Sequence, residues 1–198
     1  MRLWNGWGNE DSDLTMELSD GLRALLEALV GPGTALRQAT LNEVIAKVPN
    51  TRLDNHPLIK TDPETRVRHA RGQSLPDWLE MHSGNVDNFP DGVAFPESSE
   101  QVRELLAHAK ENNLIVIPYG GGTSVVGHIN PETSDQPVLT IDMAKMNSML
   151  SIDTESQLAT FGAGAPGPVV EEELKKHGYT LGHFPPVSYT HLTLPTKA

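Results

Sequence analysis

An apolar run that passes directly into three consecutive glycines constrains this chain more than any other feature of its sequence. Residues 114–118 read Leu-Ile-Val-Ile-Pro, a continuous apolar run that is typical of a buried strand. Glycines allow the backbone after such a strand to turn sharply and approach a ligand closely, and successive N–H groups in such a turn can converge on an anion. The candidate loop consists of Pro118, Tyr119, Gly120, Gly121, Gly122, Thr123 and Ser124. With its two hydroxyl side chains this loop suits a pyrophosphate; the alternative is a tight connection that binds nothing.

Two other nucleotide-binding patterns fit the sequence poorly. The loop lacks the lysine that would reach terminal phosphates, so a Walker A nucleotide triphosphatase is not expected. Farther along, Gly162, Gly164 and Gly167 have the G-x-G-x-x-G spacing of a Rossmann dinucleotide site. The acidic residue that should follow about 20 residues later is missing, because Gly182 and His183 stand there. The preceding elements also read as strands in a row, so we do not expect a Rossmann fold.

The elements around the glycine-rich loop predict an α+β domain. We expect strands at residues 93–96, 114–118, 136–142, 149–153 and 158–164, and helices at residues 98–113 and 166–179. The first of these helices has a capping-box start, with Ser98 facing Gln101 three residues on. Its expected apolar face consists of Val102, Leu105, Leu106 and Ala109.

Two amphipathic helices are predicted before this domain. The first lies within residues 16–33, where Asp20 can cap the helix and Gly31 ends it. The second lies within residues 39–49. Their apolar stripes are Leu22, Leu25, Leu26 and Leu29 in the first and Leu41, Val44, Ile45 and Val48 in the second. We expect both stripes to pack into a core, and we interpret residues 56–92 as a polar connector with one short helix around Asp77–Met81.

Charge and composition exclude several classes of partner. The formal net charge is −11, which argues against a nucleic-acid backbone and against an anionic membrane surface as partners. No run of about 18 apolar residues is present, so no transmembrane segment is predicted. The chain has no cysteine, and its acidic N-terminus does not resemble a signal peptide. We expect a cytoplasmic protein, with a membrane-peripheral location as the alternative for a longer parent protein.

Histidines and arginines give no pattern that predicts a metal site or a catalytic group. The histidines His56, His69, His82, His108, His177 and His183 show no paired spacing, so no metal is expected. A small basic cluster consists of Arg66, Arg68, His69 and Arg71. Such clusters are usually solvated, and we expect a surface position here. The alternative is a position near a cofactor or substrate.

The glycine-rich loop, the helix and strand before it, and the later segment from Phe161 to Pro185 together resemble the FAD-binding domain of PCMH-type (vanillyl-alcohol-oxidase type) flavoproteins. The resemblance implies that residues 118–124 hold the FAD pyrophosphate and that Pro185 belongs to a second flavin contact. Some branches of that family carry a histidine after the glycine pair that bonds covalently to the flavin. Thr123 follows the glycines here, so non-covalent FAD is implied, and we expect His128 to be an ordinary solvated or hydrogen-bonded loop histidine.

Three further stretches resemble the branch of this family that contains alkyldihydroxyacetonephosphate synthase: residues 4–8 (WNGWG), residues 68–84 and residues 143–153. The resemblance implies a parent enzyme that exchanges the acyl chain of an acyl-dihydroxyacetone phosphate for a long-chain alcohol, with the flavin as a covalent relay and no net redox change. It also implies a small-molecule or lipid-like substrate and a homodimeric parent. Two alternatives remain open: an FAD-linked oxidase or dehydrogenase of a 2-hydroxy acid, and a non-catalytic nucleotide-binding module.

The last residues read differently from the rest of the chain. Residues 187–196 can be encoded by GTC TCT TAT ACA CAT CTG ACG CTG CCG ACG, which resembles a transposase mosaic-end sequencing adapter. We therefore predict that residues 186–198 are an adapter-derived, non-native tail. Residues 1–86 are then an N-terminal helical region and connector, and residues 87–185 a truncated FAD-binding domain. Catalytic residues would lie beyond the truncation, so we predict none here and expect this chain by itself to be inactive.

Overall fold

The structure is a computed structural model that describes residues 3–6, 8, 18–35 and 37–182. The predicted tail at residues 186–198 and the predicted flavin contact Pro185 lie outside the described residues. The helices are α1 (Asp20–Val30), α2 (Leu41–Ile45), α3 (Pro63–Arg68), α4 (Leu75–Ser83), α5 (Ser99–Glu111) and α6 (Gly167–Lys176). The strands are β1 (Ile59–Lys60), β2 (Gly92–Ala94), β3 (Ile115–Tyr119), β4 (Val138–Asp142), β5 (Met149–Asp153) and β6 (Leu158–Phe161).

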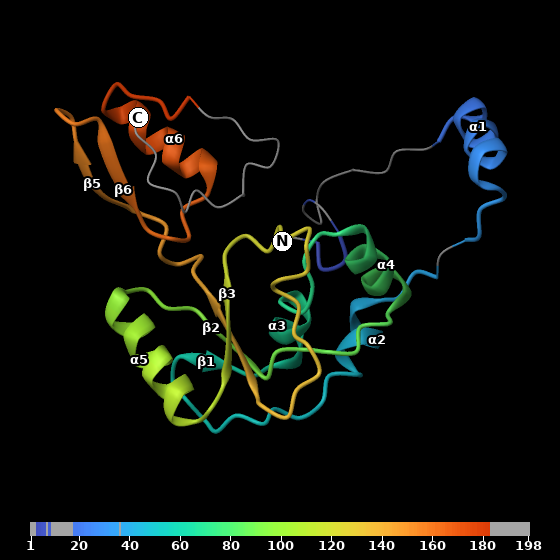
Figure 1. The fold of residues 1–198 in the computed structure, drawn as a ribbon, viewed down its shortest axis with the longest axis horizontal. Coiled ribbons are helices and arrows are strands. Elements are labelled where there is room, and N and C mark those ends of the chain that lie inside the picture. The colour runs from blue at the N-terminus through green and yellow to red at the C-terminus, as the bar shows by residue number, and fades with distance from the viewer. Residues whose placement is uncertain (1–2, 7, 9–17, 36, 183–198) are drawn as a thin grey trace.

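A four-stranded sheet in the order β1-β2-β4-β3 forms the centre of the fold (Figure 1). Strands β2, β4 and β3 are parallel, and β1 adds to β2 in the antiparallel direction. All five residues of β4 are buried, as expected for the inner strand of a covered parallel sheet. The prediction that residues 114–118 are buried throughout is wrong, because β3 lies at the sheet edge and exposes Pro118. The missing N–H of proline is tolerated at such an edge.

Helices cover both faces of this sheet. Figure 1 shows α5 on one side of the sheet and α3 on the other. The buried Leu105 of α5 packs with Ala94 of β2 and Ile141 of β4. Ser98 caps α5 as predicted, but the capping box is only half formed, since the Gln101 side chain accepts from the N–H of Glu97 instead. The mixed helix and strand content confirms the predicted α+β fold.

The strands β5 and β6 form a separate antiparallel hairpin, which α6 packs against (Figure 1). The glycines Gly162 and Gly164 follow β6 and lie against the chain at residues 143–147. A side chain at Gly162 would overlap the carbonyl of Met146, and one at Gly164 would overlap the carbonyl of Met143. Close backbone packing therefore explains this glycine pattern, in agreement with the expectation that it is not a Rossmann site.

The prediction that α1 packs its leucine stripe into a core is wrong. No residue of α1 is buried, and its leucines are 39% to 71% exposed. In Figure 1 the helix stands apart from the sheet. Its N-cap is Ser19, whose hydroxyl accepts from the N–H of Leu22, so Asp20 is the first helical residue and not the cap. The second predicted helix is confirmed as α2, whose Val44 is fully buried in a cluster with Val67 and Met81.

The connector at residues 56–92 contains more structure than its polar composition indicated. Besides the predicted helix, which is α4, it forms β1 and α3. The start of α3 carries ordinary local signals, since Asp62 caps the helix and Pro63 occupies its first turn. Strand β1 pairs with β2, so the sheet runs across the predicted boundary between residues 86 and 87. That boundary stays a prediction.

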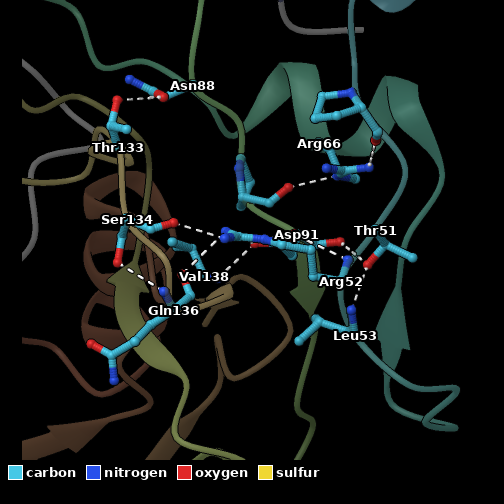
Figure 2. Close-up of polar contacts among 12 residues, drawn as sticks. Thr51, Arg52, Leu53, Arg66, Asn88, Asp91, Thr133, Ser134, Gln136 and Val138 are labelled. Carbon is cyan, nitrogen blue, oxygen red and sulfur yellow. Dashed lines mark hydrogen bonds and ion pairs between the residues drawn. The ribbon is translucent and has the colours of Figure 1, made fainter.

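A bidentate ion pair between Arg52 and Asp91 ties the segment that precedes β1 to the start of β2 (Figure 2). Asp91 is 3% exposed, and its Oδ1 and Oδ2 accept from Arg52 Nε at 2.9 Å and Nη2 at 2.7 Å. Its carboxylate also accepts from the backbone N–H groups of Arg52 and Val138, at 3.1 and 2.8 Å. One carboxylate thus joins three segments of the chain, so we expect it to stabilise the sheet strongly.

Candidate cofactor site

The glycine-rich loop begins where the parallel strands end. Tyr119 is the last residue of β3 and pairs in register with Asp142, the last residue of β4. The carboxyl end of β2, at Ala94, lies at the same edge, because Ala94 pairs with Ile141. Ligands of open parallel sheets bind outside the carboxyl ends of the strands. The topology therefore places the predicted loop at the edge where a ligand is expected.

The conformation of the loop requires glycine at one position. Gly122 is buried and has a φ of +66°, in the left-handed region that other residues rarely adopt. Its neighbours Gly120, Gly121, Thr123 and Ser124 are half-buried. The loop therefore combines a backbone conformation that favours glycine with two hydroxyl side chains, those of Thr123 and Ser124.

A histidine from the connector lies directly beneath the start of this loop. The ring of His69 packs against the ring of Tyr119 at an interplanar angle of 52°, with centroids 4.6 Å apart. Its Nε2 lies 2.9 Å from Asp142 Oδ2, and its Nδ1 lies 2.7 Å from the carbonyl oxygen of Thr65. A carbonyl oxygen can only accept, so Nδ1 is the donor in that contact. His69 thereby ties α3 to the carboxyl ends of β3 and β4.

The prediction that the basic cluster is a solvated surface is wrong for three of its four members. Arg66, His69 and Arg71 are 2%, 8% and 8% exposed. Arg66 donates to the carbonyl oxygens of Pro49 and Pro90, and burial lowers the pKa of its guanidinium while the charge of Asp91 opposes that shift. Arg71 donates to Glu80 and to backbone carbonyls. Both arginines are therefore buried and hydrogen-bonded inside the protein, where they link separate parts of the connector and join it to Pro49.

The far end of the loop is held by connector residues for which the sequence predicted no role in the site. The backbone N–H of Gln73 donates to the carbonyl oxygen of Ser124 at 2.6 Å. The backbone N–H of Gly72 donates to Asn130 Oδ1 at 3.0 Å, and Asn130 Nδ2 donates to Asp77 Oδ1 at 2.6 Å. These contacts join positions more than 50 residues apart, so no local pattern in the sequence predicts them.

The described residues also bear on His128, on groups that could hold a metal and on membrane-spanning helices. His128 is exposed, and its Nδ1 lies 3.0 Å from the hydroxyl of Ser124, which fits an ordinary hydrogen-bonded loop histidine. Within the described residues, no three histidine, aspartate or glutamate side chains gather to hold a metal ion. None of the helices in the described part of the chain is long and apolar enough to cross a membrane.

Two structural observations fit the loop to a pyrophosphate. The loop leaves the carboxyl end of a parallel strand, and its glycines include a buried one in a backbone conformation that other residues rarely adopt. Backbone N–H groups in such a turn, together with Thr123 and Ser124, are the donor types that phosphate oxygens accept from. The residues present therefore suit a dinucleotide of the FAD type at its pyrophosphate.

Comparisons with known proteins agree with this fit. The sequence pattern of the FAD binding domain family matches residues 90–194. Alkyldihydroxyacetonephosphate synthase of Dictyostelium discoideum is 32% identical over 216 residues, covering 92% of this chain and 35% of the relative. A solved structure of an alkyldihydroxyacetonephosphate synthase superposes with a TM-score of 0.77 at 28% identity, covering 96% of this chain and 42% of the other.

A second group of relatives matches a smaller part of the chain. The cytochrome-linked D-lactate dehydrogenase 1 of Saccharomyces cerevisiae is 31% identical over 106 residues, which is 53% of this chain and 18% of that protein. The present chain spans about a third or less of the curated relatives that it matches.

Proposed function

Because the chain belongs to the FAD binding domain family, we propose that residues 1–185 are the N-terminal part of a longer FAD-dependent enzyme similar to alkyldihydroxyacetonephosphate synthase. The observation that carries the proposal is the extent of the match. The synthases of Dictyostelium discoideum and Caenorhabditis elegans each cover 92% of the chain, including most of the region before the FAD domain, whereas the D-lactate dehydrogenases cover 53% to 69%. FAD-binding domains are shared by enzymes of different activity, so the region outside the domain favours the synthase.

In this proposal the loop residues bind the cofactor and carry no chemistry themselves. The backbone of Gly120, Gly121 and Gly122 and the hydroxyls of Thr123 and Ser124 hold the pyrophosphate, with Pro118 and Tyr119 fixing the exit of the strand. Pro185 would contribute to the second flavin contact. When bound, the flavin supplies the group-transfer chemistry, and the protein supplies binding and orientation. The catalytic residues lie in the parent protein beyond residue 185, so none is assigned here.

The parent reaction is an exchange in which an ether bond replaces an ester bond. A long-chain alcohol and an acyl-dihydroxyacetone phosphate give an alkyl-dihydroxyacetone phosphate and a free fatty acid, without net oxidation. A lipid-like substrate and a homodimeric, cytoplasmic or membrane-peripheral parent are parts of the same proposal. The FAD is non-covalent, since Thr123 occupies the position where a flavin-linked histidine would stand.

The full-length parent, purified with FAD, tests this function. Incubated with the two substrates and no electron acceptor, it is expected to release alkyl-dihydroxyacetone phosphate and fatty acid in equal amounts, measured by mass spectrometry. A 2-hydroxy-acid dehydrogenase would instead show loss of the oxidised flavin absorbance on anaerobic addition of D-lactate, and no ether product. That result would replace the synthase proposal with the dehydrogenase alternative.

A further inference from the structure

We propose that a group of four residues, Gly72, Gln73, Asp77 and Asn130, forms a clamp that positions the pyrophosphate loop for its cofactor. Three of the four lie in the connector, outside residues 90–194 that match the FAD binding domain. The inference rests on the proposed function, because FAD is the ligand proposed for the loop that these contacts position.

The contact between Gly72 and Ser124 is too close for any other residue. A Cβ atom at Gly72 would overlap the carbonyl oxygen of Ser124 and would also lie 3.2 Å from the Ser124 Cβ and 3.3 Å from Asp77 Oδ2. The φ of Gly72 lies outside the left-handed region, so glycine is needed here for space and not for backbone conformation. The connector and the loop thus touch backbone to backbone.

The clamp also fixes the direction of the Ser124 carbonyl oxygen. Gln73 donates its backbone N–H to this oxygen at 2.6 Å. A carbonyl oxygen free to face a phosphate would repel it, because both carry negative charge on oxygen. With that oxygen bonded to Gln73, it is directed to the connector and does not face a phosphate bound at the loop. The clamp therefore selects the orientation of the loop that an anion needs.

Asn130 and Asp77 lock this arrangement to a helix. Asn130 accepts from the N–H of Gly72 at 3.0 Å and donates to Asp77 Oδ1 at 2.6 Å. Asp77 is 2% exposed, and its Oδ2 accepts from the N–H and hydroxyl of Ser74, which caps α4. Because every polar atom of the pair has a partner, the network is rigid and its disruption is costly. The orientation of the loop is thus coupled to the N-terminus of α4.

A swap of the amide and the carboxylate tests the clamp without changing its shape. Asn130→Asp places two carboxylates where one hydrogen bond stood, and Asp77→Asn brings two amides together. The double variant Asn130→Asp with Asp77→Asn restores a donor opposite an acceptor at every contact of the pair. Val126→Ala, at an exposed loop residue outside the clamp, is the matched control.

Two readouts are needed. The first is amide hydrogen exchange at Gln73 in the 198-residue chain without ligand, which reports whether the Ser124 carbonyl is held. We expect Asn130→Asp to speed this exchange roughly tenfold, the double variant to restore it and Val126→Ala to leave it unchanged. The second is the Kd for FAD of the full-length parent, which we expect to rise about tenfold in Asn130→Asp and to return in the double variant.

Each contrary result has a distinct meaning. Unchanged exchange at Gln73 in both single variants would overturn the clamp itself. Faster exchange with an unchanged Kd for FAD would overturn its positioning role, since the contacts would then serve the fold alone. A wild-type parent that binds no FAD would overturn the proposed function and the clamp's purpose together, and is distinguished because wild-type binding is measured first.

Discussion

The 198-residue chain is expected to retain far less than one FAD per polypeptide after purification and to have no turnover. The glycine-rich loop offers contacts to the pyrophosphate, but the segments that would hold the isoalloxazine lie, in our proposal, beyond residue 185. Losing those contacts should weaken the Kd for FAD by a factor on the order of 100 or more relative to the full-length parent, which corresponds to about 2.7 kcal/mol or more. Flavin absorbance per polypeptide, with titration of added FAD, measures the difference.

The parent protein purified in the same way is the control for that measurement. It is expected to carry close to one FAD per polypeptide, released by denaturation because the cofactor is non-covalent. A 198-residue chain that holds stoichiometric FAD would show that residues outside this chain add little to the site, against the proposal.

Replacement of Asp91 by asparagine is expected to lower the free energy of unfolding at pH 7 by about 2 kcal/mol, since it removes a buried carboxylate that accepts charge-assisted hydrogen bonds from the partly exposed guanidinium of Arg52. Burial raises the pKa of Asp91, but hydrogen bonds from Arg52 and from the N–H groups of Val138 and Arg52 outweigh it, so the pKa is lowered from its usual value. A carboxyl with a lowered folded-state pKa stabilises fully above its unfolded pKa. That stabilisation is lost as the pH falls below about 4.

Urea unfolding of the wild type and Asp91→Asn across this pH range tests the prediction. The difference between the two should be largest near neutral pH and should shrink as the solution becomes acidic enough to protonate Asp91. Asp87→Asn, which changes an exposed carboxylate four residues earlier, should have little effect on the free energy of unfolding at any pH in this range. Equal unfolding midpoints for wild type and Asp91→Asn at pH 7 would contradict the role assigned to the ion pair.

Local signals explain which parts of the fold were predictable. The helix at Ser99–Glu111 has its cap and its apolar face within one stretch of sequence, and β3 coincides with the apolar run at residues 114–118. Helix α3 carried a cap at Asp62 and a proline at Pro63, but its six residues are too few to show a period. Short helices inside polar segments are the elements that such patterns miss.

Burial was harder to predict than secondary structure, because it depends on partners that are distant in sequence. The leucine stripe of α1 has the periodicity of a packed helix, yet periodicity does not say what the stripe faces, and α1 is exposed. Arg66 is the opposite case, because a residue expected at the surface is buried. It looks like a surface charge until the carbonyls of Pro49 and Pro90 are brought against it.

The candidate site divides in the same way. The loop at residues 118–124 was identified from the glycines that follow a strand, because that signal is contained within the loop. The clamp was not, since Gly72 and Asn130 are 58 residues apart and meet only in the fold. The neighbouring sequence does not distinguish a glycine needed for close packing, such as Gly72, from a glycine needed for a turn.

We propose that residues 1–185 are the beginning of a longer flavoenzyme and that residues 186–198 are not native, even though the FAD binding domain pattern matches as far as residue 194. Sequencing the source genome across the codon for Pro185 tests it most directly. We predict that the native reading frame continues past that codon into a long flavoprotein sequence and that the codons for residues 186–198 are absent. Native codons for residues 186–198 followed by a stop codon would contradict the claim and favour a small nucleotide-binding module.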